Sequence, residues 1–319
     1  METHLKLGGM FKDYAQTDTT FSKKGMWPER YSAEVRGLAL AKSAGIHTPL
    51  LLRSGIGRWG GCTVMDRIYA PRVDQVLWGN PQPSAFQSIG STLADIHGIS
   101  YEGTPTAALI NRRFQDLQTD VLRRSHLPEE VVVAAAATMS TTRLGLNGLA
   151  PVYIHGDYTI QNMFSVEPMI TYDWEHSGAG WSVYDIGVSL SFMLLLVTDG
   201  GWNYGHYFDS LRYFLEGYQA KRSLSEHELR LIDAYRFLGH RQVPQYYLFV
   251  LEYLFRQGCS AAAELVEGRA KVQENDGQLA DLGVRLDGSW SAKLRKAFAH
   301  GGYRISEKFW LWYEKEVGV

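Results

Sequence analysis

Apolar and polar residues alternate in short runs along the first seventy positions of the chain. This period of two is typical of strands that bury one face. The predicted strands cover residues 5–7, 11–15, 20–24, 48–52 and 62–68. Turn residues separate the runs, and a glycine-containing turn is predicted over residues 55–61 between the last two. The chain therefore begins with a small sheet.

A helical period follows in most of the remaining sequence. Residues 29–44 carry apolar side chains at helical spacing within the strand-rich part, and Gly45 is a plausible stop. Further helices are predicted over residues 84–97, 128–139, 185–197, 206–219, 225–238, 246–257, 261–273 and 306–316. Ser225 and Glu228 have the spacing of a capping box at the start of one of them. The pattern predicts a mainly helical remainder.

One segment in the middle of the chain concentrates polar side chains between apolar strands. A His-Gly-Asp sequence ends at Asp157, and Asn162 follows five residues later. Apolar residues resume over 163–166 and return over 169–172 after a Glu-Pro turn, which predicts a hairpin. We therefore expect Asp173, at the end of this hairpin, to lie beside Asn162.

These three polar residues are the groups that phosphoryl transfer requires. The reaction needs a carboxylate that orients an acceptor hydroxyl and oxygen ligands that hold Mg²⁺ against a triphosphate. Asp157 is the candidate catalytic residue, and Asn162 with Asp173 supplies an amide and a carboxylate oxygen for Mg²⁺. The alternative is structural, because Asp and Asn also favour turns through local hydrogen bonds.

The order of the motifs resembles the aminoglycoside phosphotransferase and choline kinase superfamily, a distant relative of the protein kinases. His-Gly-Asp at 155–157 is followed by Asn162, by Asp-Trp-Glu at 173–175 and by Tyr-Asp-Ile-Gly at 184–187. The resemblance extends in order over nearly the whole chain. Its specific part is confined to residues 153–187.

The resemblance implies an α+β, protein-kinase-like two-lobe fold. Residues 1–68 would form the nucleotide-binding lobe, a small antiparallel sheet that includes the hinge strand. Residues 69–319 would form the larger, mainly helical lobe that carries catalysis and acceptor binding. ATP or GTP and Mg²⁺ are the implied cofactors, and the sequence does not choose between the two nucleotides.

The resemblance also implies a lysine that pairs with the nucleotide phosphates. Lys23 is the first choice and Lys24 the second, because successive strand residues face opposite sides and only one can point inward. Glu34, on the helix predicted over 29–44, would fix this lysine. The alternative is that Glu34 is a solvated helix residue, the commoner fate of glutamate.

Two further segments would contact the nucleotide. Gly8 and Gly9 would let the backbone approach the phosphates, although a Gly-Gly pair is also a common turn. Backbone groups of Met65, Asp66 and Arg67, on the hinge strand, would recognise the purine edge. The part of the chain ahead of Lys23 is unusually short for the family.

The other polar residues near Asp157 are expected to be structural, except for Glu175, whose role has two alternatives. In this resemblance His155 braces the loop while Asp157 carries the chemistry. Asp185 suits a helix N-terminal carboxylate that ties the loop down. Glu175 is either a partner of the metal site or an exposed residue of the acceptor site.

Composition and charge agree with such an enzyme. A chain of 319 residues with 45% hydrophobic content can bury a sizeable core and exceeds what one core usually supports. A net charge of −2 gives no reason to propose a nucleic-acid partner. Cys62 and Cys259 form neither a metal-ligand cluster nor a disulfide framework, which favours a reducing cytoplasm.

The sequence also lacks a membrane signal. The first residues do not have the charged start and apolar core of a secretory signal, and the longest apolar stretch, 186–197, is too short to cross a bilayer. We expect a cytoplasmic protein without a membrane partner. Either a monomer or a homodimer is compatible with the sequence.

Acceptor recognition leaves a weaker signature. Many aromatic residues follow the catalytic motif, and most are expected to pack helices together, with a few lining a cleft for a sugar or an ammonium group. The polar candidates near predicted helix ends are His176, Asp199, His240 and Gln242.

Several functions remain open at this point. The leading acceptor is a hydroxyl of an antibiotic or other natural product, such as an aminoglycoside, and the resemblance implies a role in antibiotic resistance. A primary metabolite such as homoserine, choline or a sugar is the alternative. The other classes are a non-catalytic nucleotide-binding protein and a hydrolase that uses Asp157 as a base without nucleotide.

Overall fold

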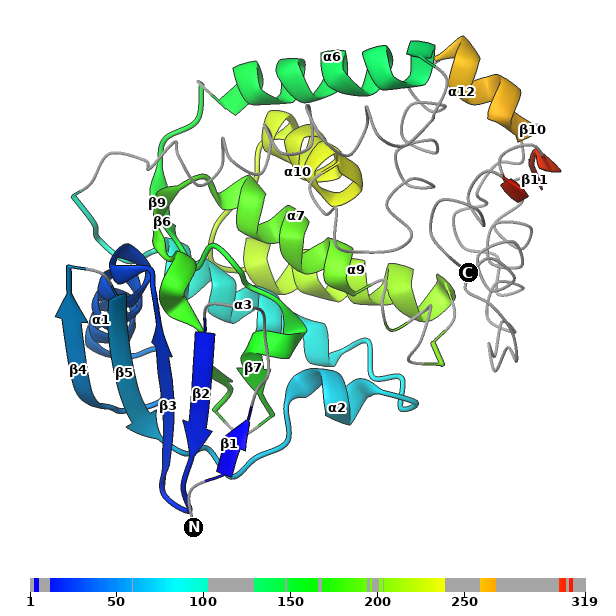
Figure 1. Ribbon diagram of the computed structural model, residues 1–319. Helices are drawn as coiled ribbons and strands as arrows, with labels where there is room; N and C mark the ends of the chain where they lie inside the picture. Colours follow the sequence, from blue (N-terminus) through cyan, green and yellow to red (C-terminus); the bar gives the residue numbers. More distant parts are fainter. Residues whose placement is uncertain are drawn as a thin grey trace.

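The computed structural model describes residues 3–5, 12–58, 60–102, 129–146, 148–165, 168–193, 196, 201–202, 204–238, 259–267, 304–307 and 310–311. Within these residues, a five-stranded sheet occupies one side of the molecule and helices form most of the rest (Figure 1). A single helix, α1 (Pro28–Ser43), packs against the sheet. The predicted α+β two-lobe fold is confirmed.

All neighbouring strands of the sheet pair antiparallel, in the order β1-β2-β3-β5-β4. The strands are β1 (Thr3–Leu5), β2 (Lys12–Gln16), β3 (Thr20–Gly25), β4 (Leu51–Gly57) and β5 (Gly60–Asp66). The strands predicted over 11–15 and 20–24 are confirmed to within one residue at each end. The first strand, predicted over 5–7, lies two residues earlier, and the strand predicted to reach residue 68 ends at Asp66.

The glycine turn predicted over 55–61 is wrong for most of its length. β4 runs on through Gly57 and β5 begins at Gly60, so the connection is a tight hairpin. A Cβ atom on Gly60 would lie 2.4 Å from the carbonyl oxygen of Gly25. This glycine therefore permits close approach of two strands, which sequence alone does not distinguish from a turn.

α1 begins and ends where its sequence signals place it. Pro28 occupies the first position, where its missing N–H is not needed, and Gly45 ends the helix with a φ of +76°. The buried face includes Tyr31, Glu34 and Leu38. A carboxylate therefore lies on the face that packs against the sheet.

The other helices form the second lobe. They are α2 (Val73–Leu77), α3 (Ala85–His97), α6 (Glu129–Leu146), α7 (Ser182–Phe192), α9 (Tyr204–Gln219), α10 (Glu226–Leu238) and α12 (Ser260–Leu265). The predicted capping box is confirmed, because the Ser225 N–H donates to Glu228 Oε2 at 2.9 Å and the Glu228 N–H donates to Ser225 Oγ at 3.2 Å.

Three predicted helices differ from the structure by three or more residues at one end or both. α6 extends to Leu146 instead of residue 139, and α7 begins at Ser182 and ends at Phe192 instead of 197. The helix predicted over 261–273 stops at Leu265, because Val266–Glu267 forms a strand, β10, that pairs with β11 (Arg304–Ile305). Pairing with a segment distant in the sequence overrides the local helical pattern there.

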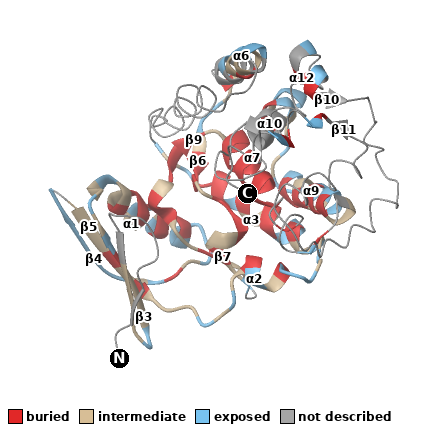
Figure 2. Cartoon of the chain, turned by 45° about the vertical axis from the view of Figure 1, so that its right-hand side comes forward, coloured by how far each residue is buried: buried red, intermediate tan, exposed pale blue. Residues whose placement is uncertain are grey.

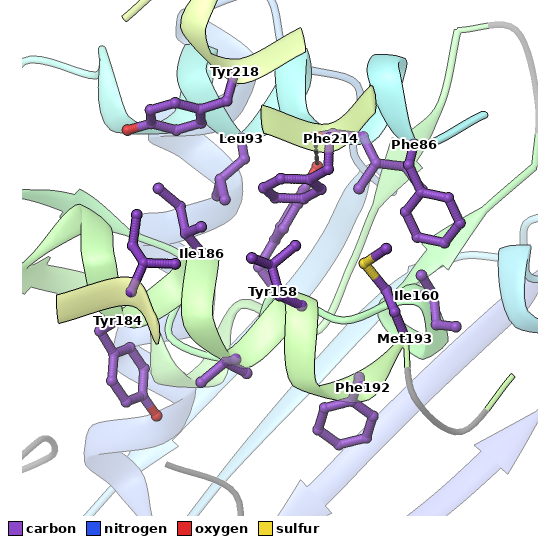
Figure 3. Close-up of a cluster of buried hydrophobic side chains, with 14 of the residues drawn as sticks. Phe86, Leu93, Tyr158, Ile160, Tyr184, Ile186, Phe192, Met193, Phe214 and Tyr218 are labelled. Carbon is purple, nitrogen blue, oxygen red and sulfur yellow. Dashed lines mark hydrogen bonds between the residues drawn. The ribbon is translucent and has the colours of Figure 1, made fainter. Parts of the chain in front are cut away.

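The core lies where α3, α7 and α9 meet. Phe86, Leu93, Ile186, Phe214 and Tyr218 are all buried and interleave there (Figure 3). α7 is buried along its whole length, while α3, α9, α1 and the strands bury one face (Figure 2). The segment that contains Asp157 runs beside this core, since the buried Tyr158 hydroxyl donates to the Ile89 carbonyl at 2.9 Å.

Two glycines set the distance between α3 and α9. A Cβ atom on Gly90 would lie 2.0 Å from the Phe214 carbonyl oxygen, and one on Gly217 would lie 2.0 Å from the Gln87 carbonyl oxygen. The two backbones therefore touch directly, each at the other's glycine. Such close helix contact requires small residues at the crossing point.

Some predicted features lie outside the described residues. They are the Gly8–Gly9 turn, the helix over 246–257, the rest of 261–273 and most of the helix over 306–316. The lobe boundary at residue 68 stays a prediction. In the part of the chain described here, none of the helices is long and apolar enough to span a membrane.

The glycine contact between α3 and α9 can be tested by Gly90→Ala. Alanine favours a helix over glycine, yet its Cβ would push α9 away, so we expect the free energy of unfolding to fall by about 2–3 kcal/mol. Chemical denaturation measures this change. Gly148→Ala, where the nearest atom to the new Cβ is 3.9 Å away, is the control and should stay close to wild type. An equally stable Gly90→Ala protein would contradict the close packing.

Candidate active site

The backbone of the loop that carries Asp157 is hydrogen-bonded to the buried carboxylate of Asp185. Strand β6 (Val152–Ile154) leads into the loop, and Asp185 lies in the first turn of α7. Its carboxylate accepts hydrogen bonds from the N–H groups of His155 at 2.7 Å and Gly156 at 2.9 Å. Asp185 is completely buried, so the loop is tied to the core by charged hydrogen bonds that water cannot replace.

Gly156 is required by the shape of this turn. It has a φ of +81°, and a Cβ atom there would lie 2.1 Å from the His176 carbonyl oxygen. His155 next to it is buried, and its Nε2 donates to the Tyr172 carbonyl at 3.1 Å. Burial lowers the pKa of His155, so the ring is neutral and braces the loop against the following hairpin.

The same carboxylate of Asp185 also contacts a buried histidine. His97 on α3 donates from Nε2 to Asp185 at 3.4 Å and accepts from the Tyr218 hydroxyl at 2.8 Å. Burial lowers the pKa of His97, which fits a neutral ring with one donor and one acceptor nitrogen. His97 is therefore a buried, hydrogen-bonded residue that links α3 to Asp185 and to Tyr218.

Asp157 and Asn162 face each other across the loop. Between them lies a short 3-10 turn, η2 (Ile160–Asn162). The Asn162 side-chain amide donates to the Asp157 carbonyl at 2.9 Å and to Asp157 Oδ2 at 3.0 Å. The amide nitrogen is thereby committed to Asp157, and the amide oxygen of Asn162 points away from it.

The predicted hairpin that brings Asp173 to the loop is confirmed. Strand β7 (Met163–Phe164) pairs with β8 (Ile170–Thr171), and the Tyr172 N–H donates to the Asn162 carbonyl at 3.1 Å. Asp173 follows with a φ of 64°, the only non-glycine residue with positive φ among those described. A strained backbone at one carboxylate is typical of a functional position.

Lys23 joins this hairpin to the other lobe. Its Nζ donates to Glu34 Oε1 on α1 at 2.5 Å and to Asp173 Oδ1 at 2.6 Å. The Lys23 side chain is only 3% exposed, whereas Lys24 next to it is exposed. The strand alternation thus turns Lys23 toward the interior and Lys24 toward the solvent.

The charge on Lys23 is stabilised by its partners. Burial by itself lowers the pKa of a lysine, but the carboxylates of Asp173 and Glu34 outweigh it. The pKa of Lys23 is raised well above its ordinary value. The ammonium group is therefore permanently charged, although almost no water reaches it.

Glu34 is also fixed from the sheet side. Thr63 on β5 lies opposite Lys23 in the strand pairing, and its hydroxyl donates to Glu34 Oε2 at 3.0 Å. Burial raises the pKa of Glu34, and the charge of Lys23 opposes this shift. Glu34 is not a solvated helix residue, so the structural alternative for it is wrong.

Glu175 belongs to the buried network. It lies in the 3-10 turn η3 (Trp174–His176), is 4% exposed, and accepts from Arg30 Nη1 of α1 at 3.2 Å. Its Oε1 also lies 3.2 Å from His176 Nε2. Of the two possibilities left by the sequence, an exposed acceptor residue is excluded. Glu175 instead forms a second link between α1 and the Asp173 segment.

Direct packing reinforces this link. A Cβ atom on Gly37 of α1 would lie 2.6 Å from Ser177 Oγ and 2.8 Å from Trp174 Cβ. Ser177 Oγ donates to the Ala33 carbonyl at 3.2 Å and accepts from the Tyr153 hydroxyl at 2.9 Å. α1, which carries Glu34, therefore packs directly against η3, the turn that follows Asp173.

The predicted purine-binding residues, Met65, Asp66 and Arg67, lie at the C-terminal end of strand β5. Met65 is buried, the Asp66 N–H donates to the Leu50 carbonyl at 3.0 Å, and the Arg67 N–H donates to the Thr19 carbonyl at 2.9 Å. Neither N–H of Asp66 or Arg67 is therefore available to a purine. Recognition of the purine by this segment stays a prediction.

Of the predicted acceptor contacts, His176 lies against the Asp157 loop through its contact with Gly156. Asp199, His240 and Gln242 lie outside the described residues. The sequence did not single out Arg30, Thr63, Gly37 or Ser177. Arg30, Glu34 and Gly37 lie on one helix face, at spacings of four and three residues. Polar and small residues at helical spacing are therefore the sequence signal that could have identified Arg30 and Gly37.

The donor set fits a magnesium ion. Within the described residues, no three His, Cys, Asp or Glu side chains gather closely enough to hold a metal by themselves. Mg²⁺ in phosphoryl-transfer enzymes usually takes one or two protein oxygens and fills its other positions with phosphate and water. The Asn162 amide oxygen, turned away from Asp157, and the Asp173 carboxylate suit that requirement.

Sequence comparison identifies one family. A profile of the phosphotransferase enzyme family matches residues 19–208, which include Lys23, Glu34 and the whole loop from Asp157 to Asp173. No curated protein matches the chain.

Several solved structures share the fold. The GDP complex of aminoglycoside 2'-phosphotransferase-IIIa is 12% identical, with a TM-score of 0.54 over 83% of this chain and 89% of that one. A choline/ethanolamine kinase family protein from Mesorhizobium loti is 15% identical, with a TM-score of 0.52 over 94% and 87%. Aminoglycoside phosphotransferase APH(3'')-Id from Streptomyces rimosus is 15% identical, with a TM-score of 0.52 over 74% and 92%.

The contact between α1 and η3 can be tested by Gly37→Ala. The new Cβ must displace α1, so we expect the free energy of unfolding to fall by about 1–3 kcal/mol. Because Glu34 moves with the helix, phosphoryl-transfer turnover should fall at least about tenfold even at temperatures where the variant is folded. Gly55→Ala, with no atom within 4 Å of the new Cβ, is the control. Wild-type turnover in a folded Gly37→Ala protein would show that this contact does not position Glu34.

Proposed function

Because the chain belongs to the phosphotransferase enzyme family, we propose that it transfers the γ-phosphoryl group of ATP or GTP to a hydroxyl of a small molecule. Membership of this family makes the protein an enzyme and a small-molecule kinase. One observation in the structure supports this reaction most strongly. A buried lysine, Lys23, is joined to carboxylates from two other segments, Glu34 and Asp173, next to the loop that carries Asp157 and Asn162.

Lys23 and Glu34 would bind the nucleotide phosphates. Glu34 is held by Thr63 and fixes the direction of the Lys23 side chain. A charged, oriented ammonium group neutralises the phosphates that are not transferred. Its second partner, Asp173, is the residue assigned to the metal, so phosphate and metal sites adjoin.

Asn162 and Asp173 would hold Mg²⁺ between them and the triphosphate. The bound ion supplies positive charge to the phosphate oxygens and lowers the cost of transfer. The protein's contribution is placement, because Asn162 is fixed by Asp157 and Asp173 by Lys23.

Asp157 would orient the acceptor hydroxyl for in-line attack. The hydroxyl oxygen forms a bond to the γ-phosphorus, the bond to the leaving nucleoside diphosphate breaks, and the carboxylate of Asp157 takes the hydroxyl proton late. Positioning is the main demand of this reaction. The tether from Asp185 to the backbone at His155 and Gly156 supports that positioning.

We infer that residues 1–68 form the nucleotide-binding lobe and 69–319 the catalytic and acceptor-binding lobe. The sheet and α1 precede residue 68, which supports this division. Met65, Asp66 and Arg67 would then meet the purine at the junction. Their carbonyl groups are the candidates, since the N–H groups of Asp66 and Arg67 are already bonded.

The leading acceptor is a hydroxyl of an antibiotic or other natural product, such as an aminoglycoside. Structures similar to this chain include complexes with kanamycin and with streptomycin. A role in antibiotic resistance would follow from such an acceptor. A polycationic acceptor needs acidic partners, and Glu34, Asp173 and Glu175 are each already paired with a basic group.

A primary metabolite is the second candidate. The choline/ethanolamine kinase family structure covers 94% of this chain, more than the aminoglycoside phosphotransferase structures described above. Homoserine, choline and sugars are therefore the metabolites to test first. Each offers at least one hydroxyl of the kind that Asp157 would orient.

The catalytic role is tested by Asp157→Asn. The amide keeps an acceptor oxygen for Asn162 but cannot take a proton, so we expect turnover to fall by about 100- to 10,000-fold. Nucleotide affinity should be unchanged, because Lys23 and its partners are intact. A coupled assay of nucleotide turnover with Mg²⁺ and ATP or GTP measures the first quantity, and titration calorimetry measures the second.

The same assay identifies the acceptor. Aminoglycosides, other hydroxylated antibiotics, homoserine, choline and sugars are supplied in turn, and acceptor-dependent turnover that Asp157→Asn abolishes establishes the kinase and its substrate class. Nucleotide binding without stimulation by any acceptor would favour the non-catalytic alternative. Product formation without nucleotide would favour the hydrolase alternative.

A further inference from the structure

Tyr31 carries a buried hydroxyl that the fold does not use. The residue lies on α1, its side chain is 2% exposed, and its ring packs across β5, where a Cβ atom on Gly61 would lie 2.5 Å from Tyr31 Cγ. In the part of the chain that the structure describes, its hydroxyl oxygen has no hydrogen-bond partner. Buried hydroxyl groups nearly always have one.

Packing alone does not explain the hydroxyl. The ring fills the space between α1 and the sheet, and the ring of phenylalanine would fill it equally well. A buried hydroxyl without a partner destabilises the folded state, whereas phenylalanine carries no such penalty. The hydroxyl therefore lowers the stability of the free protein, so a role other than packing must account for it.

The surroundings of the hydroxyl belong to the phosphate site. Tyr31 precedes Glu34 by three residues, so the two side chains lie on neighbouring parts of one helix face. Tyr14, another group near Tyr31, pairs with Lys23 across strands β2 and β3. The hydroxyl thus lies under the same part of the sheet as Lys23.

Burial keeps the Tyr31 hydroxyl protonated, and a nearby carboxylate adds to this effect. Burial raises the pKa of Tyr31 most, the carboxylate of Glu175 raises it further, and Lys23 opposes the shift. At neutral pH the group is therefore a hydrogen-bond donor. A donor near the charge of Lys23 is suited to an anionic oxygen.

We propose that the Tyr31 hydroxyl donates a hydrogen bond to a phosphate oxygen of the bound nucleotide. The inference rests on the proposed function, because it assumes a nucleotide whose phosphates reach Lys23. Tyr31 would be a nucleotide-binding residue of α1 alongside Glu34, which acts only through Lys23. The nucleotide would then complete a hydrogen bond that the free protein lacks.

Tyr31→Phe tests the proposal by two measurements with opposite signs. The free variant should be as stable as wild type or more stable in thermal and chemical unfolding, because an unpaired hydroxyl is removed. Its affinity for Mg²⁺ with ATP or GTP, measured by titration calorimetry, should fall about tenfold, as expected for a hydrogen bond to a charged acceptor. Affinity for adenosine or guanosine, which lack phosphates, should not change.

Tyr158→Phe is the matched control. Its hydroxyl is equally buried but donates to the Ile89 carbonyl at 2.9 Å. Removing it should lower the stability of the free protein and leave nucleotide affinity unchanged. The two variants are thus expected to show opposite patterns.

The outcomes separate this inference from the proposed function. If wild type binds nucleotide and Tyr31→Phe binds it equally well, the Tyr31 contact is wrong and the kinase assignment stands. A free Tyr31→Phe protein less stable than wild type would show that the hydroxyl already has a partner, which also overturns the inference. If wild type does not bind ATP or GTP with Mg²⁺, both fall together.

Discussion

The structure depends on one buried cation. Lys23 is almost completely excluded from water and is stabilised by two carboxylates that arrive from different segments, Glu34 on α1 and Asp173 after the β7–β8 hairpin. Burying a charge is unfavourable unless it is paired, so the protein must bring these segments together in order to fold around Lys23. The strand, the helix and the hairpin thereby take fixed relative positions, and those positions are the ones that the proposed phosphate and metal site needs.

The contacts between α1 and η3 show how this arrangement is kept rigid. Gly37 lets the helix backbone approach Trp174 and Ser177, and Arg30 contacts Glu175 about two turns earlier on the same face. Glu34 lies between these two anchors along the helix. A helix held on both sides of its functional residue has little freedom to swing away. The position of Glu34 is therefore set by the fold, and the nucleotide does not need to create it.

The sequence predicted the parts of the site that depend on local spacing. Asp157, Asn162 and Asp173 could be placed together because one loop and one hairpin connect them, and strand alternation favoured Lys23 over Lys24. Tertiary contacts decided the rest. Nothing near Gly60 in sequence distinguishes close approach to Gly25 from a turn, and the end of α12 depends on pairing of Val266 with Ile305. Arg30 and Ser177 likewise gained their roles only when α1 met a segment more than a hundred residues away.

The balance of charge at the site constrains how a nucleotide can bind. Two cations, Lys23 and Arg30, are paired with three carboxylates, Glu34, Asp173 and Glu175, so the group is acidic even before Asp157 is counted. A triphosphate is itself strongly anionic, and repulsion between like charges is large where water is excluded. In the proposed function a divalent cation that accompanies the nucleotide would reduce this repulsion. Uncharged hydrogen-bond donors would also favour binding, because they contact phosphate without the paired carboxylate that a buried ammonium group requires. A protonated tyrosine hydroxyl on α1 is a donor of that kind, which connects the electrostatics of the network with the unused hydroxyl of Tyr31.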